Sequence, residues 1–366
     1  MKIALVYDYL NQYGGGERVL EVLINIFPQA DIYTLFFDSK KTFNKFPEKR
    51  IKQTSFLNKK IISANHHFFI PLMPKAIESL NLKDKYDLIL SIGAGYSKGI
   101  TYHGSYHISY CFTPLRYAWE PTNYLKNKFG PKKYLFLKPI LSPLIYYLRN
   151  WDKRAGQKPD EIISISNFIA SKVKKYYRRQ SKIIYPPVNT RKFYPEIPYK
   201  NRHYFLAVGR LIHYKGFDLI IKAFNELKLP LKILGRGPEL KKLRKLNKSS
   251  QTSFISYLAN DEEMREIYNN AKALIFPQVE DFGLVAVEAL SCGTPVIAYH
   301  AGGSLEIIEN RKNGLFIKDQ TSESIIEAVN QVKEMEFNSS EISKTVQKFS
   351  EEKFKKEILK IINGFV

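Results

Sequence analysis

Two glutamates with seven residues between them, Glu280 and Glu288, form the pair best suited to chemistry in this chain. Glu280 follows a strand-like run, Ala273–Phe276, and a short polar loop, whereas Glu288 lies in an apolar helix expected to open at Phe282–Gly283. A carboxylate in such a helix is costly to bury without a polar partner. Either residue alone also fits an ordinary salt-bridged or surface glutamate. The pair, with a helix start between its members, favours a ligand site.

The helix start adds an anion site between the two carboxylates. The first N–H groups of a helix lack partners within the helix and attract phosphates. The helix rise places Glu288 roughly 7–8 Å beyond the first turn, with Glu280 on the other side. Gly302 and Gly303 follow, and glycine permits close backbone approach to a ligand. This order of acid, anion site and acid suits a sugar, a diphosphate and a ribose in a row.

The elements that must position these residues alternate between strand and helix in two halves. A strand-like run, Lys2–Tyr9, is followed by a glycine-rich turn and a helix, and the pattern restarts at Phe205–Val208 after the proline-rich stretch Tyr185–Tyr199. We therefore predict an α/β protein with two Rossmann-like βαβ domains that face a central cleft. The predicted parts are a first domain over 1–193, a second domain over 194–349, and a helix over 350–366 that packs back on the first domain.

Two turns of the first half lie where a ligand would bind, at the carboxyl ends of predicted strands. Gly14, Gly15 and Gly16 follow the first strand and would bring backbone N–H groups to a ligand, although a merely tight turn fits them equally well. A second turn, Thr113–Trp119, follows the strand-like run Ile108–Phe112.

The composition bounds the class of protein and its partner. The chain has 366 residues with a net charge of +22, which predicts two domains and an anionic partner: nucleic acid, phospholipid or a phosphorylated substrate. Its two cysteines, Cys111 and Cys292, give no disulfide framework, so we expect a reducing cytosol. We expect neither a signal peptide, since Asp8 interrupts the short apolar N-terminus, nor a membrane span.

Two segments, Lys40–Lys60 and Tyr124–Arg154, mix aromatic residues into a basic sequence. Pro139 and Pro143 are predicted to break the second segment, so one continuous helix is not expected there. Such segments fit an anionic membrane interface or, equally, a solvated basic face.

Together these motifs resemble the retaining glycosyltransferases of family four, which have the GT-B fold. The resemblance covers nearly the whole chain. It is carried by Gly14-Gly15 with Glu17, by VGRLIHYKG (Val208–Gly216), by the E-x7-E stretch, and by the tail CGTPVIAYHAGGSLEII. The segments IALVYDYLNQYGGGERVLE, SYCFTPLRYAWE and IIYPPVNTRKFYP are similar to a bacterial subgroup that includes mannosyltransferases of O-antigen and other surface polysaccharides.

The resemblance implies that the domain over 1–193 binds the acceptor and that the domain over 194–349 binds the nucleotide sugar. It also implies roles for individual residues. Glu280 would bind the hydroxyls of the donor sugar, and Glu288 those of the ribose. Arg210 and Lys215 would neutralise the diphosphate as it leaves, although a pair of surface cations remains the alternative. Further implied donor positions are Gly15, Gly16 and, through backbone N–H groups, Phe282, Gly283 and Leu284. Implied acceptor positions are Gly14, Thr113 and Arg116.

Two positions depart from the family pattern. Phe112 stands where relatives commonly have a histidine that contacts the donor sugar, and His103 and His107 do not match the motif. Either that role is dispensable or borne by the backbone, or donor choice or activity is altered. Tyr257 stands where relatives often have glycine.

The resemblance implies a metal-independent hexosyltransferase without a cofactor, using GDP-mannose as co-substrate and a lipid-linked glycan as acceptor. It would work in the cytoplasm, peripherally at the inner face of the cell membrane. The basic aromatic segments Lys40–Lys60 and Tyr124–Arg154 would then contact anionic lipid. No DxD motif or His/Cys/Asp cluster with metal-ligand spacing occurs. The alternatives are a UDP-sugar donor, a non-catalytic protein that binds a nucleotide sugar or a glycan, and a nucleic-acid-binding protein, for which no recognised motif is present.

Overall fold

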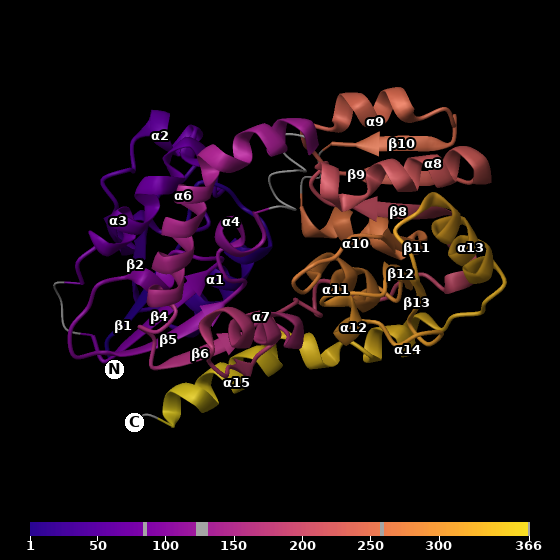
Figure 1. Ribbon diagram of the computed structural model, residues 1–366. Helices are drawn as coiled ribbons and strands as arrows, with labels where there is room; N and C mark the ends of the chain where they lie inside the picture. The colour runs from indigo at the N-terminus through magenta and orange to yellow at the C-terminus, as the bar shows by residue number, and fades with distance from the viewer. Residues whose placement is uncertain (83–85, 122–130, 257–259, 365–366) are drawn as a thin grey trace. The chain divides into compact units, whose positions relative to one another are not determined.

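The computed structural model describes residues 1–82, 86–121, 131–256 and 260–364 (Figure 1). The chain forms two compact units, Met1–Tyr185 and Pro186–Val366, and divides at the start of the predicted proline-rich linker. Each unit has its own parallel sheet with flanking helices, which confirms the predicted pair of Rossmann-like domains. The last helix, α15 (Glu351–Asn363), belongs to the second unit, and its packing on the first domain stays a prediction.

The sheet of the first unit has the strand order β3-β2-β1-β4-β5-β6-β7 among the described residues, with parallel pairing throughout. Its central strand β4 is buried along its whole length, as expected for a parallel strand with both faces covered. The strands are β1 (Ile3–Tyr7), β2 (Asp31–Thr34), β3 (Ile51–Thr54), β4 (Leu88–Gly93), β5 (Tyr106–Cys111), β6 (Glu161–Ser164) and β7 (Lys182–Ile183).

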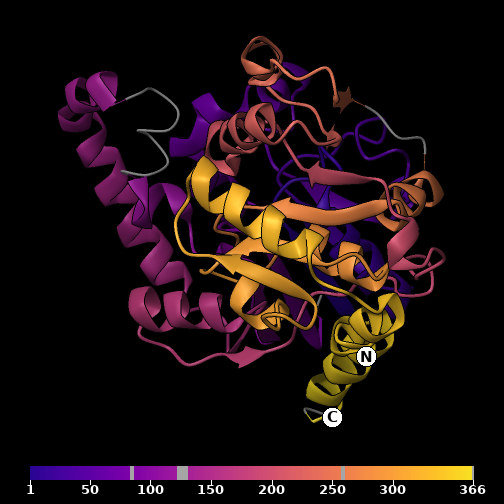
Figure 2. The ribbon, with the colours of Figure 1, turned by 90° about the vertical axis from the view of Figure 1, so that its right-hand side faces the viewer.

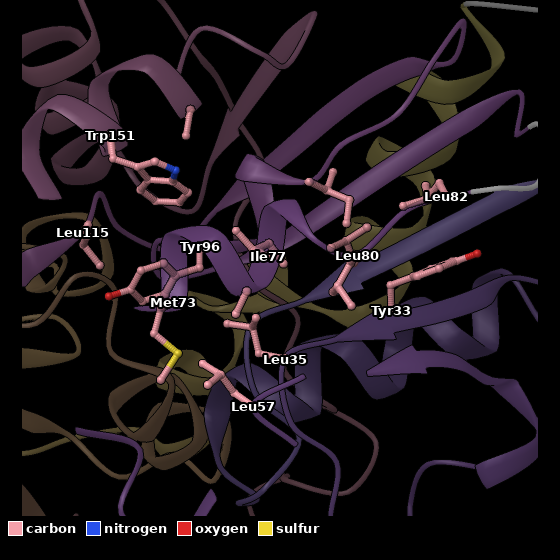
Figure 3. Close-up of a cluster of buried hydrophobic side chains, with 14 of the residues drawn as sticks. Tyr33, Leu35, Leu57, Met73, Ile77, Leu80, Leu82, Tyr96, Leu115 and Trp151 are labelled. Carbon is pink, nitrogen blue, oxygen red and sulfur yellow. The ribbon is translucent and has the colours of Figure 1, made fainter. Parts of the chain in front are cut away.

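Helices of the first unit enclose a core cluster on one face of this sheet. Figure 3 shows members of this cluster, among them Trp151, Leu115, Tyr96, Met73 and Ile77. Ala4 and Ile89 of the sheet also belong to it. The helices and short 3-10 turns are α1 (Gly15–Ile26), η1 (Glu48–Arg50), α2 (Lys60–Ala64), η2 (His66–Leu72), α3 (Met73–Glu78), η3 (Ser97–Gly99), α4 (Arg116–Trp119), α6 (Pro131–Ala155) and α7 (Asn167–Tyr177).

The second unit repeats the design with the strand order β10-β9-β8-β11-β12-β13. Its strands are β8 (Tyr204–Val208), β9 (Leu231–Leu234), β10 (Thr252–Ile255), β11 (Ala271–Phe276), β12 (Val296–Tyr299) and β13 (Gly314–Ile317). Figure 2 shows α13 lying across the sheet, where it packs on α8. The helices and 3-10 turns are η4 (Tyr199–Asn201), η5 (His213–Lys215), α8 (Phe217–Leu227), α9 (Leu240–Leu246), α10 (Asp261–Asn269), α11 (Leu284–Ser291), α12 (Ser304–Ile307), α13 (Ser322–Lys333), α14 (Ser339–Lys344) and η6 (Gln347–Phe349), followed by α15.

The structure corrects the prediction that prolines break the basic aromatic segment. Pro139 and Pro143 both lie inside the continuous helix α6. They are exposed and one turn apart on the same face, so water can bind the carbonyls that lack a helical partner. The buried side of the same helix, including Leu148 and Trp151, packs in the core and holds the helix together. The part of this segment from 124 to 130 lies outside the described residues.

Two strands were not predicted, β3 and β7. Both are at the edges of the first sheet and are short, and residues such as Lys52 and Lys182 interrupt their apolar pattern. Charged residues are a common protection of edge strands, and they remove the alternation by which a strand is recognised. Within the described residues, no helix combines the length and apolar character that a bilayer crossing requires.

Candidate functional site

The order in which the chain adds strands to the second sheet reverses between the adjacent parallel strands β8 and β11. From β8 the chain continues to β9 on one side, whereas from β11 it continues to β12 on the other. The carboxyl ends of strands at such a reversal form the usual ligand position of an open α/β sheet. The loops that begin at Gly209 and Pro277 leave these two strand ends, and they carry Arg210, Lys215 and Glu280.

The Glu280 loop is fixed by glycines of the loop that follows β12. The Gly303 N–H donates to the carbonyl of Glu280 at 2.8 Å. A Cβ on Gly303 would lie 2.3 Å from the carbonyl oxygen of Phe282, and one on Gly302 would lie 2.5 Å from that of Glu280. The sequence predicts that these glycines allow a ligand to approach the backbone closely. In the structure, the group that approaches them is the backbone of Glu280 and Phe282. The Glu280–Phe282 segment thus packs directly on the backbone of the loop after β12.

A helix begins directly after this segment, as the sequence predicts. Helix α11 starts at Leu284, and Gly283 precedes it with a φ of 120°, a conformation that glycine adopts without strain. Because Gly283 has no side chain, it cannot cap the first N–H groups of the helix. The N–H groups around Phe282, Gly283 and Leu284 thus lie at a helix N-terminus suited to an anion.

Lys215 and Glu280 form an ion pair in the second unit. Lys215 is in η5, and the next residue, Gly216, has a φ of 71° and packs close to Pro277, so the loop after β8 lies against the loop after β11. The Lys215 ammonium contacts a Glu280 carboxylate oxygen, and the two side chains are only 15% and 20% exposed. Arg210 is exposed at the end of β8.

Glu288 is buried and has a partner that the sequence did not indicate. Its carboxylate accepts a 2.9 Å hydrogen bond from the hydroxyl of Tyr268, which is fully buried in α10. The polar partner that burial of Glu288 requires is thus supplied by another helix. The available signal was a tyrosine four residues after Met264, on the apolar side of the stretch that forms α10.

In the first unit, the predicted glycines form the start of α1. Gly14 is its N-cap and Gly15 its first residue, while a Cβ on Gly16 would lie 2.5 Å from the Tyr7 hydroxyl and 2.9 Å from the Phe112 ring. Glu17 is 3% exposed, and its carboxylate accepts hydrogen bonds from Tyr7 (3.2 Å) and Gln12 (3.4 Å). Burial raises the pKa of the Glu17 carboxyl.

Phe112, the position where a histidine was expected, is filled by an aromatic ring that packs on this glycine turn. The ring makes edge contacts with Tyr7 and Tyr110, at centroid distances of 6.5 and 5.7 Å. His107 is at the opposite end of the same strand, fully buried, with its Nε2 2.8 Å from the Ser91 hydroxyl. Burial lowers the pKa of His107 to about 3. His103 precedes that strand and is exposed, so neither histidine replaces the missing one.

The acceptor positions predicted after β5 differ in accessibility. Thr113 is 3% exposed, and its buried hydroxyl has no hydrogen-bond partner among the described residues. Arg116 is half-buried at the first residue of α4. Tyr257 lies outside the described residues.

In the first sheet, the strand order reverses between β1 and β4, and a carboxylate without a predicted role lies at this point. Asp8 follows β1 and accepts hydrogen bonds from the backbone N–H groups of Ala94 (2.6 Å), Tyr96 (3.0 Å) and Ser97 (2.6 Å). Burial raises its pKa. A charged residue at the very end of an apolar strand was the available signal.

The candidate residues therefore form two sets, one in each unit. The second unit holds Arg210, Lys215, Glu280, Phe282, Gly283, Leu284 and Glu288, and the first holds Gly14, Gly15, Gly16, Thr113 and Arg116. Within the described part of the chain, no group of His, Cys, Asp and Glu side chains is arranged to hold a metal ion.

Comparison with protein families matches residues 190–356 to the glycosyl transferases group 1. The chain carries a glycosyl transferases group 1 domain. This domain contains every candidate residue of the second unit. Over 215 residues, 56% of its length, the chain is 31% identical to an uncharacterized glycosyltransferase of Methanocaldococcus jannaschii. Over 386 aligned positions, 97% of the chain and 94% of the relative, it is 23% identical to O-antigen chain mannosyltransferase C of Escherichia coli.

The matched lengths differ between relatives. The chain spans 60% of the archaeal relative's length, and 35% and 37% of two further uncharacterized glycosyltransferases. Among solved structures, Anabaena Alr3699/HepE in complex with UDP superposes over 100% of both chains, with a TM-score of 0.71 at 16% identity. The group 1 domain and the preceding unit thus match glycosyltransferase structures of the GT-B fold, as the sequence resemblance implies.

Proposed function

We propose that the protein is a retaining hexosyltransferase that transfers mannose from GDP-mannose to a lipid-linked glycan in cell-surface polysaccharide synthesis. The Lys215–Glu280 pair beside the uncapped start of α11 is the observation that carries this proposal. It combines a cation, an anion site and a carboxylate at one strand reversal, as a nucleotide diphosphate sugar requires. The Escherichia coli relative, named as an O-antigen chain mannosyltransferase, supports mannose as the sugar.

In this proposal the ion pair is exchanged when the donor binds. Lys215 moves its contact to the diphosphate, and Glu280 accepts hydrogen bonds from hydroxyls of the sugar. As the glycosidic bond to the diphosphate breaks, negative charge builds on the leaving group, where Lys215, Arg210 and the N-terminus of α11 stabilise it. Glu288 binds the ribose with its carboxylate oriented by Tyr268.

The acceptor reacts on the face that the diphosphate leaves, which retains the configuration. Its hydroxyl oxygen forms the new glycosidic bond while its proton passes to a diphosphate oxygen, so no protein nucleophile is required. Gly14, Thr113 and Arg116 are the proposed acceptor-side positions, whereas Gly15 and Gly16 are proposed donor positions. The acceptor is carried by a membrane, which requires peripheral contact with anionic lipid at the cytoplasmic side.

A stabilisation series tests the donor site. We expect GDP to raise the melting temperature more than UDP, ADP or single-stranded DNA. At equal concentration, the ligand with the highest affinity for the folded state stabilises it most. Selective stabilisation by UDP would instead identify a UDP-sugar donor, and stabilisation by DNA alone would contradict the proposal. Glu288→Gln should abolish most of the nucleotide effect; an unchanged effect would refute the ribose assignment.

A transfer and hydrolysis screen with a panel of nucleotide sugars tests catalysis. We expect Lys215→Met to lower kcat by about 10²–10³-fold, the usual effect of removing a group that stabilises transition-state charge. Glu280→Gln should lower kcat by about 10²-fold, because the sugar loses a group that positions it for reaction. Lys312→Met is the matched control, because Lys312 forms an exposed ion pair with Glu309 away from the site. Nucleotide binding without any turnover would favour the non-catalytic alternative.

A further inference from the structure

The outward face of helix α6 carries several of the most exposed apolar side chains described in the first unit. Phe136 is 86% exposed, Ile140 74% and Leu135 71%, and Tyr146 follows at 68%. Figures 1 and 2 both show α6 as a long helix on the outside of this unit. The exposed apolar residues along α6 are Leu135, Phe136, Pro139, Ile140, Pro143, Tyr146 and Tyr147, and Lys138 and Ser142 are exposed beside them. A large contiguous apolar surface on a folded protein usually marks an interaction site.

The orientation of this face is fixed from the opposite side of the helix. Leu148, Trp151 and Ala155 are at most 3% exposed and belong to the core cluster of the unit. The Trp151 indole N–H donates to Glu78 at 2.7 Å, and the Arg149 guanidinium donates to the carbonyl of Ala118 at 2.9 Å. Rotation of α6 would break these contacts, so it cannot bury its apolar outer face in its own unit.

The polarity of the outer face changes along the helix axis. Toward its C-terminal end lies a groove lined by Tyr146, Tyr147, Asn150, Lys153, Arg154 and Gln157. Lys153 and Arg154 are exposed in this groove, about 25 Å along the axis from Phe136. Tyrosine, lysine and arginine at the edge of an apolar surface are the residues expected where hydrocarbon gives way to phosphate headgroups.

We propose that the outer face of α6 binds the surface of an anionic lipid bilayer. Leu135, Phe136 and Ile140 enter the boundary between headgroups and acyl chains, while Lys153 and Arg154 contact lipid phosphates. The helix therefore lies obliquely, with its N-terminal half deeper. A parallel symmetric contact with a second copy of the chain would bring the cations of both copies together, whereas lipid phosphates neutralise them.

This inference rests on the proposed function only for its choice of a membrane as occupant. It names the surface that would bring a membrane-carried acceptor to the enzyme. It also assigns the contact to α6, which the sequence alone predicts to be broken by its prolines.

Co-sedimentation of the full chain with phosphatidylcholine vesicles, with and without phosphatidylglycerol, tests the proposal. We expect binding to anionic vesicles that weakens as salt is raised. The double variant F136S/I140S should weaken binding at least about 10-fold, since it removes two inserted side chains. K153Q/R154Q should weaken it by a similar factor at low salt and remove most of the salt dependence. Melting temperatures confirm that the variants are folded.

Matched variants on the second unit provide the control. Leu305→Ser removes a side chain that is 49% exposed, and K312Q/K344Q removes two exposed cations. Both should bind vesicles as the wild type does. If they weaken binding as much as the α6 variants, or if F136S/I140S binds normally, the proposal is wrong. A dimer in solution that F136S/I140S converts to monomer would identify a second copy as the occupant.

Depth measurements separate insertion from simple charge attraction. Phe136→Trp should be quenched by lipids brominated in the acyl chain, whereas Asn150→Trp should not, after subtraction of the wild-type signal. Equal quenching of both would exclude the oblique orientation. Nucleotide-selective stabilisation is measured on the same proteins without lipid, so a failure of membrane binding is distinguishable from a failure of the proposed donor site.

Discussion

At the scale of single residues, Asp152 connects the α6 helix to the loop that carries Thr113 and Arg116. It is fully buried, and its carboxylate accepts hydrogen bonds from Lys98 (2.6 Å), Trp119 (2.7 Å), Tyr177 (2.8 Å) and, at 3.4 Å, the N–H of Leu115. One carboxylate thus holds both ends of the turn Leu115–Trp119. The sequence placed Asp152 only within a basic segment.

Removing this carboxylate should be costly. Asp152→Ala leaves the Lys98 ammonium buried without its ion-pair partner, so we expect urea unfolding to show a loss of about 3–5 kcal/mol. The double variant D152A/K98M removes both charges and should recover part of that loss. If the double variant is less stable than Asp152→Ala alone, the ion pair is not the source of the effect.

His107 makes a different prediction, on the pH dependence of stability. Burial lowers its folded-state pKa to about 3, below the ordinary value of 6.5. Between these two pH values the imidazole is protonated in the unfolded chain and neutral in the folded chain. Its contribution to stability is therefore full above about pH 6.5 and falls as the pH is lowered toward 3. Between pH 7 and 5, the wild type should lose about 2 kcal/mol more than His107→Gln in urea unfolding. Parallel losses in both proteins would contradict this assignment.

At the scale of elements, the donor-side geometry depends on the contact between the loop after β12 and the start of α11. Gly303 has its Cα packed on the backbone of Phe282, and a backbone neighbour cannot move aside as a flexible side chain can. The position of the helix N-terminus is thus determined by a loop that itself need not touch the donor.

A substitution at this contact should act on ligand binding. Gly303→Ala places a Cβ 2.3 Å from the Phe282 carbonyl oxygen and must displace the Glu280–Phe282 segment, so we expect nucleotide affinity to fall at least about 10-fold. Titration calorimetry measures this. Gly364→Ala is the control, because its nearest neighbour would be 3.3 Å away at the end of α15. Normal affinity in Gly303→Ala would show that the segment adapts.

At the scale of the molecule, each unit has its own sheet and its own buried core, so unfolding should not follow a single two-state transition. Candidate donor residues are concentrated in the second unit. A nucleotide should therefore stabilise that unit selectively.

Calorimetry with and without nucleotide checks this expectation. At a ligand concentration of 100 times Kd, the transition of the second unit should gain about 2.7 kcal/mol, while the transition of the first remains nearly unchanged. Equal shifts of both transitions would mean that the units unfold together or that both bind the nucleotide. The variant Glu288→Gln provides a baseline with weakened binding.

The sequence alone determined the features that depend on local pattern. The order of strands and helices, the division near Tyr185–Tyr199, and the placement of Glu280 before a helix and Glu288 within it follow from apolar periodicity and glycine positions, which act over short stretches of chain. The match to the glycosyl transferases group 1 over residues 190–356 agrees with that interpretation.

Tertiary structure decided what depends on groups distant in sequence. Lys215 meets Glu280, and Tyr268 meets Glu288, because parallel strands bring separate loops and helices to one edge of the sheet. Pro139 and Pro143 do not interrupt α6, because core packing of the opposite face outweighs a local preference against helix. Such contacts have no local pattern, since pairing and burial are set by which elements the fold places side by side.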